Sequence, residues 1–157
     1  MTKTNAMRIL DKAKIVYEPY EYTVDENDLT GVHIAREIGL DPDYVFKTIV
    51  AKGDKTGYLV FCIPCAMELD LKKCAKASGD KKIELLHVKD LLAATGYIRG
   101  GCSPIGMKKA FPTFIDETAL LWDKITVSAG IRGCQLMLSP NELIALIGAE
   151  TADLTAI

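Results

Sequence analysis

Apolar residues recur at helical spacing in five stretches of this chain. Between residues 6 and 13, for example, the apolar side chains fall on approximately one face of a helix. The predicted helices cover residues 4–14, 32–38, 71–77, 88–95 and 140–147, with one further helical turn over 41–46. Residues suited to helix starts and stops stand at their ends: Thr30, Asp70 and Ser139 at starts, and Gly39, Gly79, Gly96 and Gly148 at stops.

Shorter runs between these helices have the character of strands. Residues 15–24 alternate weakly and include three tyrosines. Residues 47–52 and 58–63 are apolar runs joined by a loop of five residues, so an antiparallel hairpin is expected. Further strands are predicted at 97–99, 114–116, 125–128 and 135–138, and residues 149–157 carry no clear pattern. Helices and short strands that interleave in this way predict one α+β domain over residues 1–157, with a mixed sheet curled around a pocket.

Length and charge limit the possible partners. A chain of 157 residues can bury one core without disulfide support. The pI of about 5.7 argues against wrapping of a nucleic-acid duplex, although the lysines between residues 72 and 82 permit contact with one short end. No apolar run approaches the ~20 residues that cross a bilayer, and the first residues lack the apolar centre of a secretory signal. We therefore expect a cytoplasmic protein without a membrane partner.

The cysteines and histidines form no recognisable catalytic or metal-binding pattern. Five cysteines fit a disulfide framework poorly and agree with a reducing compartment. Cys62 and Cys65 have CxxC spacing, but they end an apolar strand and do not begin a helix, where a thiolate would be stabilised. The other cysteines are too scattered to complete a zinc site, and neither His33 nor His87 stands in a triad motif. We expect buried thiols, no metal and no cofactor, with a thiol-based redox enzyme as an alternative.

Residues 95–109 form the most distinctive segment of the chain. Four glycines, one proline and three basic residues occur there directly after a predicted helix. Successive free amides in a glycine-rich turn can form a concave nest for an oxygen or a negative charge. The basic residues would favour an anionic or carbonyl-bearing ligand, and an ordinary surface loop is the alternative. Residues 128–133 form a similar segment, in which a predicted strand ends in glycines and one basic residue.

Lys47 is the most interesting charged residue, because it stands where a turn gives way to an apolar strand. Its stem is expected to be partly buried while its ammonium points into a cleft, where it could hold a carbonyl or ribose oxygen. A solvent-facing lysine at a strand edge is the alternative. Tyr20 and Tyr22 fall on the same face of their strand, since side chains alternate between faces. Packing on the sheet surface would explain both tyrosines equally well.

Four segments in this order resemble the YbaK/EbsC family of free-standing Cys-tRNA(Pro) deacylases, which are related to the insertion domain of bacterial prolyl-tRNA synthetases. The segments are 45–50 (VFKTIV), 68–77 (ELDLKKCAKA), 95–109 (TGYIRGGCSPIGMKK) and 127–133 (VSAGIRG). The resemblance implies a mixed, partly closed, barrel-like sheet surrounded by helices. It also implies removal of mischarged cysteine from the 3′ aminoacyl-adenosine end of tRNA(Pro), with prolyl-tRNA synthetase as a candidate partner.

The resemblance also implies roles for individual residues. The functionally central lysine of the family falls on Lys47, and the family tyrosine falls on Tyr22, with Tyr20 as second choice. The implied substrate-binding residues are Tyr20, Gly100, Gly101, Ser103, Ser128 and Gln135. The amides of the two glycines are expected to face the substrate. In the family's reaction the thiol of the attached cysteine attacks its own ester carbonyl and leaves as a cyclic thiolactone, so no enzyme nucleophile is required.

Three positions depart from the family pattern. Cys102 stands where an aliphatic residue is common, so its thiol is not expected to act as a nucleophile. Ala129 replaces a glycine, and Gln135 stands where some members carry aspartate, which weakens any role for a negative charge there. Amino-acid preference stays open, because family relatives act on cysteine, alanine or several small residues. A non-catalytic module that binds a tRNA end or assists a synthetase would use the same residues.

Overall fold

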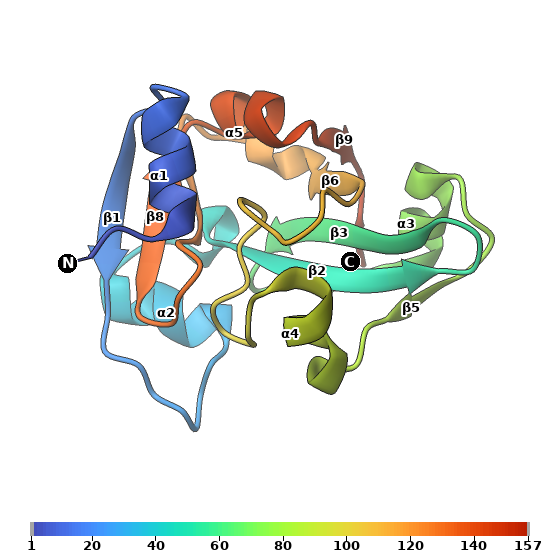
Figure 1. Cartoon of the computed structure of the whole chain (residues 1–157), viewed down its shortest axis with the longest axis horizontal. Coiled ribbons are helices and arrows are strands. Elements are labelled where there is room, and N and C mark those ends of the chain that lie inside the picture. The colour runs from blue at the N-terminus through green and yellow to red at the C-terminus, as the bar shows by residue number, and fades with distance from the viewer. Residues whose placement is uncertain (1, 157) are drawn as a thin grey trace.

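Four of the five described helices begin at a side-chain cap that the sequence supplies, and four end at a glycine. In the computed structural model, which describes residues 2–156, they are α1 (Asn5–Lys12), α2 (Gly31–Ile38), α3 (Leu71–Ser78), α4 (Val88–Thr95) and α5 (Pro140–Ile147) (Figure 1). The side chains of Thr4, Thr30, Asp70 and Ser139 each accept a hydrogen bond from an amide in the first helical turn. The four later helices end at a glycine in the left-handed conformation, as predicted.

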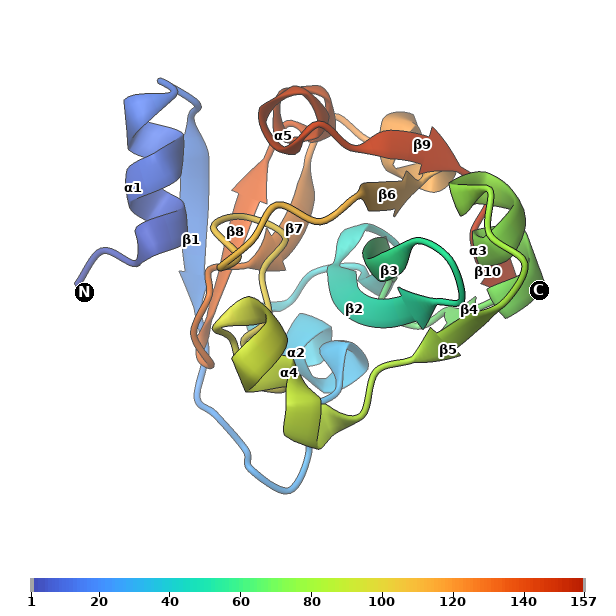
Figure 2. The ribbon, with the colours of Figure 1, turned by 45° about the vertical axis from the view of Figure 1, so that its right-hand side comes forward.

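The strands form three sheets, which confirms the α+β class with a mixed sheet. Their bounds are β1 (Tyr17–Glu21), β2 (Phe46–Gly53), β3 (Gly57–Pro64), β4 (Glu68–Leu69), β5 (Ile83–Leu85), β6 (Thr113–Asp116), β7 (Ile125–Ser128), β8 (Cys134–Leu138), β9 (Glu150–Ala152) and β10 (Thr155–Ala156). The sheet orders are β5-β2-β3-β6-β9, β1-β8-β7 and β10-β4. Only the β3–β6 and β6–β9 pairs are parallel among the strand pairs of residues 2–156. A parallel bridge between Val45 and Thr126 joins the two larger sheets, which lie side by side (Figure 2).

The predicted hairpin is present as β2 and β3, with Lys47 opposite Ile63. Its loop is shorter than expected, because Gly53 and Gly57 pair with each other and leave only residues 54–56 between the strands. The predicted strand at 97–99 is wrong: the chain turns there, and the Gly101 amide donates to the Ile98 carbonyl. Two short 3-10 helices, Pro42–Tyr44 and Glu117–Leu121, complete the described elements.

The central strand β3 is buried on both faces. Val60 and Cys62 face a core shared with α1, α5 and the three-stranded sheet. Leu59, Phe61 and Ile63 face a second core, which contains residues of α3 and the C-terminal segment. A strand buried in this way carries apolar side chains at successive positions, as residues 58–63 do. Within residues 2–156, no helix is long and apolar enough to cross a bilayer.

Candidate functional site

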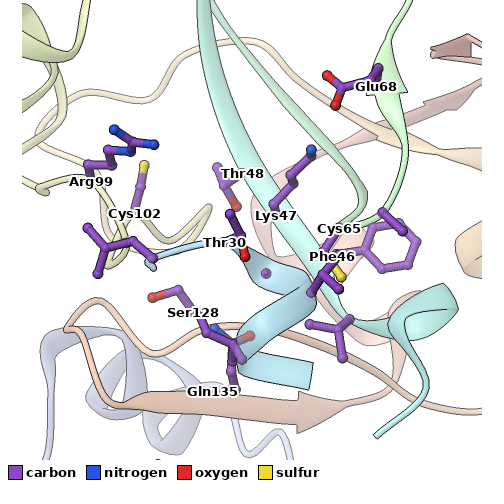
Figure 3. A pocket seen from close by; sticks show the side chains of 17 residues that line it. Thr30, Phe46, Lys47, Thr48, Cys65, Glu68, Arg99, Cys102, Ser128 and Gln135 are labelled. Atoms are coloured by element: carbon purple, nitrogen blue, oxygen red, sulfur yellow. The ribbon is translucent and has the colours of Figure 1, made fainter. Parts of the chain in front are cut away.

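A cavity of about 480 Å³ lies between the start of β2, the N-terminus of α2 and the glycine-rich loop (Figure 3). Its walls are residues 29–32 and 34 around the start of α2, 45–48 at β2, and Cys65, Ala66 and Glu68 after β3. Arg99, Gly100 and Cys102 line it from the loop, and Ser128 and Gln135 line it from β7 and β8. The cavity therefore joins segments that are far apart in the sequence.

Lys47 lines the cavity from the beginning of β2. Strand β5 pairs with β2 only over residues 51–53, and the bridge to β7 lies at Val45, so Lys47 and Thr48 have ladder partners only in β3 among the described residues. Phe46 and Thr48, the neighbours of Lys47, also line the cavity. Lys47 is half-buried and pairs with no carboxylate among residues 2–156. Its ammonium is therefore available to a ligand.

Of the two glycine amides that the sequence led us to expect at the cavity, one is engaged within the loop and one is available. Gly101 donates its amide to the Ile98 carbonyl at 3.0 Å, so that amide is engaged. Gly100 occupies the third position of this turn with φ of 85°, a conformation that favours glycine. Gly100 lines the cavity, and no group among residues 2–156 accepts a hydrogen bond from its amide. A Cβ atom on Gly101 would lie 3.0 Å from the carbonyl carbon of Ile131, so Gly101 allows two loops to pack closely.

Ser128 and Gln135 form a buried polar wall of the cavity. They lie opposite each other in the β7–β8 ladder. The Thr126 hydroxyl donates to Gln135 Oε1 at 3.2 Å, and the Gly130 amide donates to Ser128 Oγ at 3.1 Å, which fixes both side chains. Ser103 lies outside the lining: it is fully buried, and its hydroxyl accepts a hydrogen bond within the glycine-rich loop.

Neither Tyr20 nor Tyr22 is part of the cavity lining. Tyr20 lies opposite Gln135 in the β1–β8 ladder, and its phenol donates to Glu18 at 3.4 Å. Tyr22 follows β1, and its amide donates to the Gly133 carbonyl at 2.9 Å. Burial raises the pKa of the Tyr22 phenol, while the nearby Gly133 backbone and Gln135 side chain oppose this shift. Tyr22 is therefore near Gln135 but is not itself part of the cavity lining.

The thiols at the cavity are protonated at neutral pH. Burial raises the pKa of Cys102 and of Cys62 to about 12, and that of Cys65 to about 11 although the nearby charge of Lys47 lowers it. A thiol with a pKa near 12 is ionised to about one part in 10⁵ at pH 7. The cysteines of the chain are free. Cys102 and Cys65 line the site as small, uncharged groups and supply no thiolate.

Two parts of the site were missed by the sequence reasoning. The first is the N-terminus of α2, whose first amides are unused within the helix and whose dipole favours negative charge. A Cβ atom on Gly31 would lie 2.3 Å from Cys65 Cβ, so the helix begins directly against the turn after β3. The second is Glu68, the only carboxylate in the cavity lining among the described residues. The cap at Thr30 was visible in the sequence, but no local pattern indicated what the helix or Glu68 would face.

Comparisons with known proteins agree on one family. The model of the aminoacyl-tRNA editing domain matches residues 26–146. The chain is 51% identical, over 98% of its length and 93% of the relative's, to a protein of Enterococcus faecalis (strain ATCC 700802 / V583) provisionally named Cys-tRNA(Pro)/Cys-tRNA(Cys) deacylase EbsC.

Solved structures support the same fold. One, described as a candidate trans-editing enzyme for prolyl-tRNA synthetase, matches with a TM-score of 0.81 at 23% identity and covers 99% of this chain and 100% of its own. The hypothetical protein APE2540 matches with a TM-score of 0.88 at 20% identity, over 98% of this chain and 100% of its own.

Proposed function

Because the chain belongs to the aminoacyl-tRNA editing domain family, we propose that it is a trans-editing deacylase that removes cysteine from Cys-tRNA(Pro) and also accepts Cys-tRNA(Cys). The observation that carries the proposal is the cavity in which the free ammonium of Lys47 and the free amide of Gly100 lie together. Both groups are donors suited to a carbonyl or ribose oxygen. The protonated thiols of the lining agree with a reaction in which the substrate supplies the nucleophile.

The proposed reaction is an intramolecular transfer. The cysteinyl sulfur forms a bond to its own ester carbonyl carbon, the bond from that carbon to the ribose oxygen breaks, and the thiol proton ends on that oxygen. The products are cysteine thiolactone and tRNA with a free 3′ end. Lys47 and the Gly100 amide hold the carbonyl and ribose oxygens, and Lys47 serves as a positioning and charge-stabilising group, not as a base.

Positioning can supply much of the rate in such a reaction. Well-oriented intramolecular reactions gain ~7–11 kcal/mol from orientation alone. A hydrogen-bond donor at a developing oxyanion adds ~2.7–4 kcal/mol. Because the Gly101 amide is engaged within the turn, we assign one such contribution to Gly100 and none to Gly101.

A partner synthetase is part of the proposal. The formal net charge of −2 gives weak attraction to RNA, so we expect modest affinity for free tRNA. Prolyl-tRNA synthetase, which holds tRNA(Pro), would then present the misacylated end. Tight binding of bare tRNA at physiological salt would contradict this part.

A panel of misacylated tRNAs tests the function. Purified Cys-tRNA(Pro), Cys-tRNA(Cys), Ala-tRNA(Pro) and Pro-tRNA(Pro) are incubated with the protein, and ester loss and thiolactone formation are followed. We expect both cysteinyl esters to disappear with formation of thiolactone. Loss of the alanyl ester alone would identify a deacylase for another small amino acid. Binding of the tRNA end without loss of any ester would identify a non-catalytic module.

A further inference from the structure

The charged groups that line the cavity are unevenly distributed. Lys47 and Arg99 are cationic, and the N-terminus of α2 adds a partial positive charge. Among the described residues of the lining, Glu68 supplies the only negative charge. An aminoacyl ester carries an α-amino group on the carbon next to the ester carbonyl, and the protonated form of this amine is an ammonium group. A cavity with cations alone would repel that ammonium group.

Glu68 is placed to receive such a group beside Lys47. In the view of Figure 3, the Lys47 side chain extends toward the side on which Glu68 lies, and Arg99 lies on the other side. The Glu68 carboxylate is exposed and forms no ion pair among residues 2–156. Because the carbonyl oxygen and the α-nitrogen of an aminoacyl ester are bonded to adjacent carbons, one substrate can contact both side chains.

The backbone of Glu68 is anchored by the C-terminal segment. Glu68 lies opposite Ala156 in the β4–β10 ladder. The Asp70 amide donates to the Leu154 carbonyl at 2.9 Å, and Lys73 Nζ donates to the Thr155 carbonyl at 2.7 Å. These C-terminal partners lie beyond residues 26–146, which the family model matches. The carboxylate therefore projects from a paired strand, which limits the ways in which it can move away from the cavity.

We infer that Glu68 is a positioning residue that binds the α-ammonium group of the aminoacyl ester. In this orientation the carbonyl oxygen turns toward Lys47, and the nucleotide lies toward Arg99 and the glycine-rich loop. Gln135 is neutral, so Glu68 is the only side chain of the described lining that can pair with an ammonium group by charge. The inference rests on the proposed deacylase function.

The test compares two substrates that differ only in the amino group. Cysteinyl-tRNA(Pro) is compared with 3-mercaptopropionyl-tRNA(Pro), which keeps the thiol and the ester but lacks the α-nitrogen. Both are given to the wild-type protein, to Glu68→Gln and to the control Glu150→Gln, which changes an exposed strand glutamate outside the cavity lining. Loss of a hydrogen bond to a charged group predicts that Glu68→Gln lowers kcat/KM for the cysteinyl ester about tenfold.

The ratio of the kcat/KM values for the two esters distinguishes a positioning role of Glu68 from a general folding defect of the variant. Glu68→Gln should leave kcat/KM for the mercaptopropionyl ester unchanged, and Glu150→Gln should change neither. An equal fall for both esters, or no fall for either, overturns the inference while the wild-type protein still deacylates Cys-tRNA(Pro). If the wild-type protein cleaves no aminoacyl ester, the proposed function itself has failed.

Discussion

Replacement of Lys47 by alanine is the sharpest test of the cavity as a catalytic site. The change removes an ammonium group from β2 and leaves the backbone ladder with Ile63 in place. Lys47 is half-buried and has no carboxylate partner among residues 2–156. Its removal should therefore change the free energy of unfolding by no more than about 0.5 kcal/mol. A loss of activity in this variant would report on the site and not on folding.

The expected fall in activity of the Lys47→Ala variant follows from the interaction that is removed. A hydrogen bond from a charged group contributes about 1.5–3 kcal/mol. Since about 1.36 kcal/mol corresponds to a tenfold change in rate, kcat/KM for Cys-tRNA(Pro) should fall about 10- to 150-fold. If the ammonium stabilises charge that develops on the carbonyl oxygen, kcat and kcat/KM fall together. If it only holds the ribose, KM rises while kcat is unchanged.

The assay follows release of the amino acid from purified Cys-tRNA(Pro) under single-turnover and multiple-turnover conditions. Lys52→Ala is the matched control, because Lys52 lies on the same strand, is exposed and does not line the cavity. It should retain the wild-type rate. Lys47→Arg keeps the positive charge and should recover part of the activity. Undiminished deacylation by a folded Lys47→Ala protein would refute the reasoning.

Three further predictions concern the loop and the thiols. Gly101→Ala should lower the free energy of unfolding by about 1–3 kcal/mol in urea denaturation, because its Cβ atom would crowd the Ile131 backbone; an unchanged midpoint would contradict this. Iodoacetamide at pH 7 should leave deacylation intact, since burial raises the pKa of the Cys102 thiol to about 12; rapid inactivation would count against a protonated thiol. Stability should fall as pH rises above 9, the ordinary pKa of a thiol, because Cys62 ionises there only when the protein unfolds. For this thiol, the free energy of unfolding should fall by ~1.4 kcal/mol per pH unit until the pKa of the folded state is reached. Cys62→Ala should make the slope of the free energy of unfolding against pH shallower, and equal slopes in the variant and the wild type would disprove this prediction.

Local chemistry explains which elements were predicted correctly. A cap such as Thr30 and a stop such as Gly39 act within a few residues, so the sequence around them determines the helix ends. The β2–β3 hairpin is also local, since its strands are adjacent in the chain. Residues 97–99 were predicted as a strand, but a strand needs a partner strand, which the fold does not provide there, and the chain turns at Ile98–Gly101 instead.

The sequence by itself determined the α+β class, the helix ends, the central hairpin and the family, together with Lys47, Gly100, Ser128 and Gln135 as site residues to be tested. Only the tertiary structure decided what lies beside them. Short strands such as β4 and β10 are stable only when paired with each other, so no local pattern predicted that Glu68 would be held at the cavity. The same holds for the engaged amide of Gly101, whose hydrogen bond depends on how the turn closes. Capping and alternation act over a few residues, whereas a cavity is formed by segments that meet only after the chain has folded.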